Sequence, residues 1–306
     1  MGSSLLSVGR WPRCSAISHG ADGDPVDDPV ISHGASVLNI FIACLLVYAG
    51  PLVAYAHGHE LSFSFEAAHS SPSQDGPKEL WLRGEIAEGD AHRMTAFLRR
   101  HPAEFLESGG TIHLNIDGGD VLEAWALGEL IRDAMMDVRV TDSGRTRCTS
   151  ACFFIFVSAA SRVADEGTVG IHRPHIDPQT LARATPAPVR ERYEALMADT
   201  AGKLEKLQVP RDIIETMMRT PPGESYWLSA DELRRIGELA PWFDDYASAK
   251  CAVDAGLHER MRQAKAAGYE LEALWLEEQW AAAAKCFDGL RRVQRQRLLD
   301  DWNAAR

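Results

Sequence analysis

The sequence predicts an α/β fold built around a largely parallel sheet, and three observations support this prediction. Short apolar runs of strand length alternate with segments of helix length between residues 79 and 171. Strands that helices connect in this way form parallel sheets through right-handed crossovers. The chain of 306 residues is 45% hydrophobic and 25% charged, which is typical of a globular protein with one large domain or two modest ones.

Charge and cysteine content exclude some classes of function. The net charge of −12 argues against a nucleic-acid partner, because phosphate binding requires a basic face. The six cysteines include no pair with the CxxC spacing of a zinc ribbon or a thioredoxin-like site. We interpret three histidines in a polar stretch as solvated side chains (His57, His59 and His69). We therefore predict no metal site and no cofactor.

The N-terminal part of the chain, as far as Lys78, is expected to lie outside the main domain. Residues 1–36 are rich in Ser, Gly, Asp and Pro and are expected to be disordered. Residues 37–56 are apolar and uncharged, and they end in Ala-Tyr-Ala, which has the form of a signal-peptidase site. A signal peptide cleaved after Ala56 is one interpretation, a retained membrane anchor is the second, and a buried core helix, which Pro51 disfavours, is the third. The first two place the rest of the chain outside the cytoplasm, with a linker at 57–78.

From residue 79 the expected elements follow in order. The expected strands span residues 79–86, 111–115, 138–141, 162–164, 168–171 and 226–228. The expected helices span residues 91–107, 121–136, 148–160, 189–207 and 211–218. Asp90 is the expected N-cap of the first helix and Pro102 its interruption. The helix at 148–160 is apolar on all sides, so we expect it to be buried. Ser229 and Glu232 have the spacing of a capping box for a short helix.

These elements form an expected domain at residues 79–246, and a helical extension follows at 247–306. The extension is rich in Ala, Glu, Arg and Leu, and Gly268 divides it into an expected hairpin of two helices. Cys251 and Cys286 lie on either side of Gly268, at nearly equal separations along the chain. The two cysteines would therefore meet at the base of an antiparallel helix pair. We predict a disulfide between them, which fits an oxidising compartment.

The predicted chemistry depends on a serine, a histidine and a glycine pair. Ser150 precedes the apolar run FFIFV in a strand-turn-helix pattern, which presents a hydroxyl at a helix N-terminus. His172 ends the predicted buried strand that follows this helix, where it can act as a base for that hydroxyl. The amides of Gly118, at the exit of another strand, and of Ala151 can together bind an oxyanion.

Other interpretations of the same residues stay open. Ser150 has the sequence context of a simple helix N-cap as well as that of a nucleophile. His175 is a second candidate base, in a loop flanked by proline. Cys148 and Cys152 flank Ser150, and a nucleophilic role for either would require a thiolate environment. A disulfide between these two would interrupt the first turn of the expected helix.

The order of these motifs resembles the proteolytic subunit of the Clp protease and, more closely, its exported periplasmic relatives. The resemblance covers roughly residues 79–239. Its matching pieces are Gly84-Glu85-Ile86, Ile116-Asp117-Gly118-Gly119, Thr149-Ser150-Ala151, Arg162, Gly170-Ile171-His172-Arg173-Pro174 and Trp227-Leu228-Ser229-Ala230-Asp231-Glu232-Leu233 with Gly237. The resemblance implies the ClpP/crotonase-like fold, a spiral of ββα units. It also implies that Ser150 is the nucleophile, His172 the base, and Gly118 and Ala151 the oxyanion hole.

One position departs from the family pattern. The family places an aspartate shortly before the Leu-Ser-Ala segment to orient the histidine, and here that position is Ser225, with Glu224 beside it. We expect Glu224 to take this role, and the alternatives are a Ser-His dyad or an inactive protein. The family's ATPase-docking tail is not recognisable.

The sequence therefore predicts an ATP-independent serine hydrolase, a peptidase, acting in the periplasm or after secretion. Its expected partners are a peptide or protein substrate and further copies of itself, with membrane association if the apolar segment is retained. The alternative is a catalytically inactive ClpP-like assembly or interaction module. A crotonase-type acyl-CoA enzyme is the third hypothesis, and it would require CoA binding.

Overall fold

The computed structural model describes residues 60–67, 78–108, 110–141, 144–175 and 186–305. These residues belong to a single structural unit, Ala56–Arg306. The segments expected at 1–36 and 37–56, with most of the linker expected at 57–78, lie outside the described residues. The described part of that linker differs from the prediction, because Ser62–Ala67 form a strand that pairs with the strand Lys78–Ile86.

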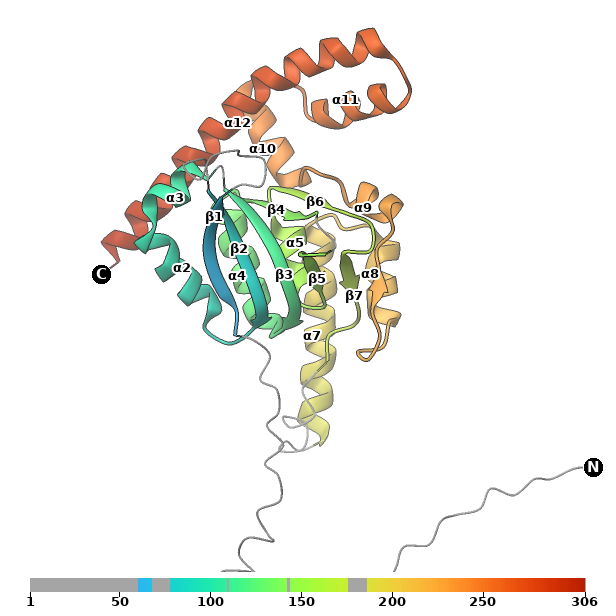
Figure 1. Ribbon diagram of the computed structural model, residues 1–306. Helices are drawn as coiled ribbons and strands as arrows, with labels where there is room; N and C mark the ends of the chain where they lie inside the picture. Colours follow the sequence, from blue (N-terminus) through green and yellow to red (C-terminus); the bar gives the residue numbers. More distant parts are fainter. Residues whose placement is uncertain (1–59, 68–77, 109, 142–143, 176–185, 306) are drawn as a thin grey trace, which may run out of the picture. The chain divides into compact units, whose positions relative to one another are not determined.

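A mixed, mostly parallel sheet forms the centre of this unit (Figure 1). Its described strands are β1 (Ser62–Ala67), β2 (Lys78–Ile86), β3 (Thr111–Gly119), β4 (Asp137–Val140), β5 (Arg147–Thr149), β6 (Ser161–Ala164), β7 (Val169–Ile171) and β8 (Tyr226–Trp227). The main order is β1-β2-β3-β5-β7-β8, in which only the outer pairs β1–β2 and β7–β8 are antiparallel. The prediction of an α/β fold with a largely parallel sheet is confirmed.

β3 branches the sheet because its two halves have different partners. Its first half pairs with β4, which pairs in turn with β6, and its second half pairs with β5. The side chains of Ile112, Leu114 and Ile116 alternate along β3 and are fully buried on one face of the sheet. This branching leaves the carboxyl ends of β3, β5 and β7 as neighbours.

Helices cover the sheet and continue beyond it. The described helices of the main domain are α2 (Asp90–Arg100), α3 (Pro102–Glu107), α4 (Val121–Asp133), α5 (Cys152–Ser158), α7 (Pro186–Lys206), α8 (Arg211–Arg219) and α9 (Ala230–Ile236). α4 and α5 lie on the apolar face of β3, and Trp125 of α4 stacks on Phe154 of α5 with ring centroids 4.6 Å apart. α5 is buried along its whole length, as its nearly all-apolar sequence predicts.

Two predicted helix starts differ from the structure. The helix expected from Cys148 begins only at Cys152, because Cys148 lies in β5, where it pairs with Ile116 of β3 and Val169 of β7. A short apolar run does not distinguish a buried strand from a buried helix. Asp90 is the first residue of α2 rather than its cap, and its carboxylate accepts a hydrogen bond from the Ala87 amide at 2.7 Å.

Other local predictions agree with the structure. Pro102 separates α2 from α3, as expected for a residue that lacks an amide hydrogen. The capping box at the start of α9 is present in both directions, with the Ser229 hydroxyl accepting from the Glu232 amide. Arg162 is buried behind α5, and its guanidinium donates to the carbonyls of Val157, Ile236 and Gly237 at 2.6 to 3.0 Å.

Three helices form the C-terminal part of the described chain: α10 (Pro241–Cys251), α11 (Leu257–Ala266) and α12 (Glu270–Ala304). The expected boundary between residues 246 and 247 falls inside α10. Gly268 lies between α11 and α12 with φ +74°. α12 is held to the sheet by an ion pair between Arg291 and Asp137 of β4, 2.8 Å apart.

The expected Cys251–Cys286 disulfide is present, although its setting differs from the prediction. Cys251 ends α10 and Cys286 lies within α12, so the bond links α12 to α10 rather than closing the α11–α12 pair. A turn at residues 252–256 separates α10 from α11, and two of its residues have positive φ (Ala252 and Gly256).

Candidate functional site

Three of the predicted site residues lie at the carboxyl ends of three adjacent parallel strands. Gly118 belongs to the end of β3, Ser150 follows β5 and His172 follows β7. β5 pairs with β3 through Ile116–Cys148 and with β7 through Thr149–Gly170. This register makes Gly118 the neighbour of Ser150 on one side, and brings the end of β7 alongside on the other.

Ser150 forms a sharp elbow between β5 and α5. Its φ is +58°, a left-handed conformation that costs an ordinary L-residue about 1–2 kcal/mol. Backbone contacts hold it there, because the Ser150 amide donates to the Gly170 carbonyl at 2.9 Å and its carbonyl accepts from the Phe153 amide at 3.0 Å. A strained serine between a strand and a helix is the geometry that exposes a nucleophile at the end of a sheet.

Gly118 fits closely against this serine. It has φ +116°, and a Cβ added to it would lie 2.8 Å from the Ser150 Cβ and 3.2 Å from the Ser150 Oγ. A side chain at this position would therefore displace the hydroxyl. Gly119 has a separate reason to be glycine, because its added Cβ would overlap the backbone of Ile86. The glycine pair thus lets the backbone approach both the serine and β2.

The amide of Ala151 is a buried donor beside the Ser150 elbow. Ala151 is 1% exposed and follows Ser150 at the start of α5. Within the described part of the chain, this amide makes no backbone hydrogen bond. A buried donor without an acceptor is costly, and an oxyanion formed at Ser150 would supply one.

His172 is buried, with 9% of its surface exposed, and its ring is oriented by the backbone. Its Nδ1 lies 2.9 Å from the carbonyl oxygen of Arg173. A carbonyl accepts but does not donate, so this contact favours the tautomer that carries its proton on Nδ1 and leaves Nε2 unprotonated, as an acceptor. The amide of Arg173 donates to the Thr220 carbonyl at 3.1 Å, which fixes the segment. The ring of His175, the second candidate base, lies 6.1 Å away between centroids.

Glu224 has a different environment from the one expected for an orienting carboxylate. It is exposed, and its amide closes a turn by donating to the Pro221 carbonyl at 3.0 Å. Among the described residues, the Nδ1 partner of His172 is the Arg173 carbonyl and not the Glu224 carboxylate. The role of Glu224 stays a prediction, whereas the atom that faces Nδ1 is a backbone oxygen that no sequence motif identifies.

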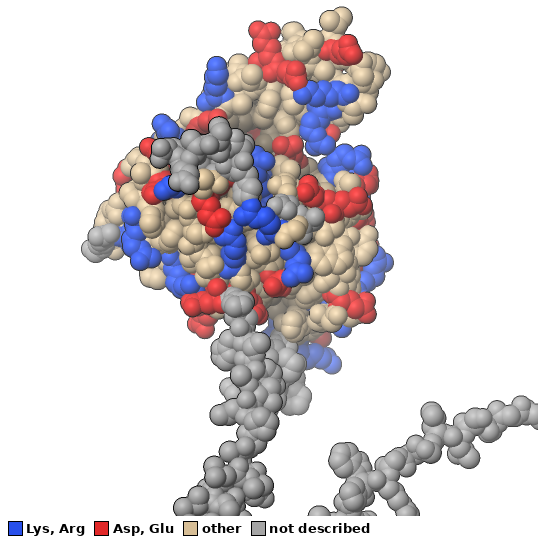
Figure 2. All heavy atoms as spheres, in the orientation of Figure 1, with Lys and Arg blue, Asp and Glu red and all other residues tan. Residues whose placement is uncertain are grey.

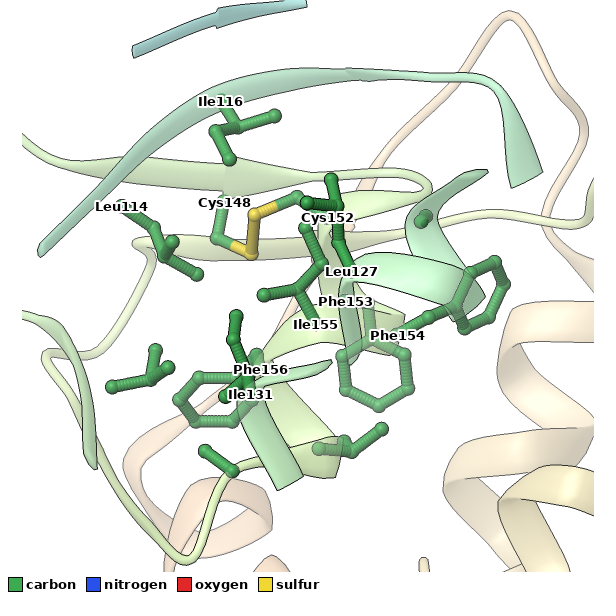
Figure 3. Packing of buried hydrophobic residues seen from close by; sticks show 14 of the residues in the cluster. Leu114, Ile116, Leu127, Ile131, Cys148, Cys152, Phe153, Phe154, Ile155 and Phe156 are labelled. Carbon is green, nitrogen blue, oxygen red and sulfur yellow. A yellow bond between two sulfur atoms is a disulfide. The ribbon is translucent and has the colours of Figure 1, made fainter. Parts of the chain in front are cut away.

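Cys148 and Cys152 form a disulfide that brackets Ser150 (Figure 3). Both are fully buried, beside the β3 residues Leu114 and Ile116. A cysteine in a disulfide is not a nucleophile, so while the bond persists neither Cys148 nor Cys152 has that role. The predicted conflict with the first helical turn does not arise, because α5 begins after the elbow.

The surface around the strand ends carries both signs of charge. Arg147 of β5 pairs with Asp117 of β3 at 2.6 Å. Figure 2 shows Lys and Arg side chains interspersed with Asp and Glu side chains over the face that bears these strands. No group of three or more metal-ligating side chains is present in the described ranges, and none of their helices is long and apolar enough to cross a membrane.

Comparisons with known proteins give likenesses in structure only. No protein-family model matches the chain, and no curated protein matches it either. One similar structure is a mutant of 1510-N, a membrane-bound stomatin-specific protease, with TM-score 0.35, 16% identity, and coverage of 52% of this chain and 75% of that one. Another is a mutant of ClpP1 from Listeria monocytogenes, with TM-score 0.34, 19% identity, and coverage of 52% and 86%. At TM-scores below 0.5 neither likeness bears on what this chain does.

Proposed function

We propose that this chain is a serine hydrolase that cleaves peptide bonds, with Ser150 as its nucleophile. The elbow conformation of Ser150, with Gly118 pressed against its side chain, is the observation that carries the proposal. An ordinary N-cap serine has extended φ and ψ and accepts from an amide of the following turn, as Ser229 does. Ser150 has neither feature, so a structural role as a cap does not account for its conformation.

The proposed reaction uses His172 as general base and then as general acid. Nε2 accepts the Ser150 proton as Oγ attacks the carbonyl carbon of the substrate, and an acyl-enzyme forms when that proton passes to the leaving amine. The amides of Gly118 and Ala151 donate to the oxyanion of the tetrahedral intermediate. The Arg173 carbonyl accepts from Nδ1 and holds the ring in one tautomer, in the place where a triad has a carboxylate.

The proposed site of action is outside the cytoplasm. The structure contains two disulfides within its described residues, Cys148–Cys152 and Cys251–Cys286. Such bonds form and persist in oxidising compartments and are rare in the cytosol. They support the interpretation of residues 37–56 as a signal peptide or a membrane anchor. We also propose that copies of the chain associate with one another.

A catalytically inactive interaction module is the second candidate. The observation that favours it is the Nδ1 partner of His172, since a carbonyl stabilises a developing imidazolium less than a carboxylate does. The two candidates differ in whether the Ser150 hydroxyl is activated.

Labelling with a fluorophosphonate probe separates the two candidates. We expect wild-type protein to label, Ser150→Ala to lose all labelling, and His172→Gln to lose at least 100-fold in rate. Ser229→Ala is the matched control, because it removes the cap of α9 and costs about 1 kcal/mol of stability without touching the site. Labelling that persists in Ser150→Ala would overturn the assignment, and an unlabelled wild-type protein that is folded would favour the inactive module.

A further inference from the structure

We propose that the Cys148–Cys152 disulfide is a positioning device that holds Ser150 in its reactive conformation. This inference rests on the proposed function and assigns the pair a role in it. The bond joins the strand on one side of the elbow to the first helical residue on the other, with Ser150 at the centre of the bridged segment. The chain therefore closes a covalent ring around its own candidate nucleophile.

The conformation of Ser150 explains why such a ring would matter. At φ +58° the serine is strained, and two backbone hydrogen bonds, at its amide and at its carbonyl, oppose a return to an ordinary conformation. A return to negative φ would turn the chain after Thr149 and separate the end of β5 from the start of α5. The disulfide prevents this separation, because its two Cα atoms are fixed 5.2 Å apart.

The surroundings of the two cysteines transmit this constraint to the hydroxyl. Cys148 is anchored in the sheet, where its amide donates to the Thr168 carbonyl at 2.9 Å. Cys152 begins a helix whose residues are all buried, so neither end of the ring can move freely. The part of the segment left to adjust is the one at Thr149, Ser150 and Ala151, which carries the hydroxyl and the amide that act in catalysis.

The second disulfide provides a comparison within the same chain. Cys251–Cys286 joins residues 35 apart, whereas Cys148–Cys152 joins residues 4 apart. A cross-link restricts the unfolded chain more when it closes a longer loop. The Cys251–Cys286 bond, called the distal bond below, should therefore contribute more to the stability of the whole fold. The bond at the elbow should contribute more to the reactivity of Ser150.

The first test compares two double variants of the full chain. Cys148→Ala with Cys152→Ala removes the bond at the elbow, and Cys251→Ala with Cys286→Ala removes the distal bond as the matched control. Saturation kinetics with a fluorophosphonate give the maximal labelling rate and the half-saturating probe concentration separately. We expect the elbow variant to lose at least tenfold in maximal rate with half-saturation within twofold of wild type. The control should keep both values within twofold and lose more in melting temperature.

The second test keeps every side chain near the serine unchanged. It uses the variant with Cys251→Ala and Cys286→Ala, which keeps the bond at the elbow. This variant is unfolded in urea and refolded either under oxidising conditions or in the presence of tris(2-carboxyethyl)phosphine. Reduction breaks the sulfur–sulfur bond, the two sulfurs take up protons from water, and the phosphine becomes its oxide with the water oxygen. We expect the reduced form to label at least tenfold more slowly than the oxidised form, and reoxidation to restore the rate.

Each outcome decides the inference separately from the proposed function. An elbow variant or a reduced form that labels within twofold of its oxidised counterpart overturns the positioning role, while wild-type labelling leaves Ser150 as nucleophile. If neither the variant nor the reduced form folds, the bond holds the fold as a whole, and the positioning role is equally overturned. A folded wild-type protein that never labels overturns the proposed function itself.

Discussion

Gly118→Ala is the substitution that the geometry of the site predicts most sharply. The added Cβ would lie 2.8 Å from the Ser150 Cβ, whereas ordinary contacts of this kind begin at 3.4 Å. The serine side chain or the glycine backbone must therefore move by about 0.6 Å, the difference between the two distances. Either movement separates the hydroxyl from the amide that is proposed to bind the oxyanion.

The expected loss of reactivity follows from this displacement. Misplacing a reacting group by about 1 Å costs on the order of 100-fold in rate. Losing one oxyanion donor costs about 100-fold to 1,000-fold, or roughly 2.7–4 kcal/mol. We therefore expect the fluorophosphonate labelling rate of Gly118→Ala to fall by about 100-fold or more. Stability should fall by only about 1–3 kcal/mol, the cost of placing a side chain at positive φ.

Gly167→Ala is the matched control for backbone strain. Gly167 also has a positive φ, +75°, but a Cβ added there would meet no atom within 4 Å. This variant should lose stability to a similar degree, measured by urea denaturation, and should label at the wild-type rate. If Gly118→Ala labels within threefold of wild type while folded, the close approach of Gly118 to Ser150 has no role in reactivity, and the reasoning is refuted.

The remaining predictions concern the histidine partner and two buried charges. Glu224→Gln should label within twofold of wild type, because His172 is oriented by a carbonyl; a tenfold loss would show that the carboxylate reaches the ring. Arg162→Met should lose about 3 kcal/mol or more in urea denaturation, because it leaves three buried carbonyls without donors; a loss below about 1 kcal/mol would contradict this. Burial raises the pKa of Asp137 from 3.8 to about 6, against the opposing effect of Arg291. The folded state then binds the proton more tightly, so the free energy of unfolding should fall as pH rises from about 4 to about 6, and Asp137→Asn should remove that part of the slope.

Strand β3 of the central sheet was predictable because apolar and polar residues alternate along it. Ile112, Leu114 and Ile116 alternate with polar residues, and a glycine pair ends the run, so both the strand and its exit could be located. Apolar residues do not separate the two elements near Cys148, because the short strand β5 and the buried helix α5 follow each other within one run of small and apolar residues. Ser150 was expected at the N-terminus of a buried helix, whereas the strand that precedes it, β5, was not among the expected strands.

Pairs of residues far apart in the sequence were predictable only where their separation along the chain indicates that they meet. The Cys251–Cys286 pair could be predicted from its near-equal distances to Gly268, yet the turn at residues 252–256 that assigns Cys251 to α10 has no strong sequence signal. The Arg173 carbonyl opposite His172 could not be predicted at all, because every residue carries a carbonyl. A carboxylate was expected at that position since only side chains are visible in a sequence.

Locating the fluorophosphonate adduct on the chain tests the central claim most directly. After labelling of the folded wild-type protein, trypsin releases a peptide from Cys148 to Arg162 that contains three serines: Ser150, Ser158 and Ser161. Fragmentation of that peptide by mass spectrometry distinguishes them. The proposed hydrolase predicts one adduct, on Ser150. An adduct on any other residue, or none on protein shown to be folded, would contradict it.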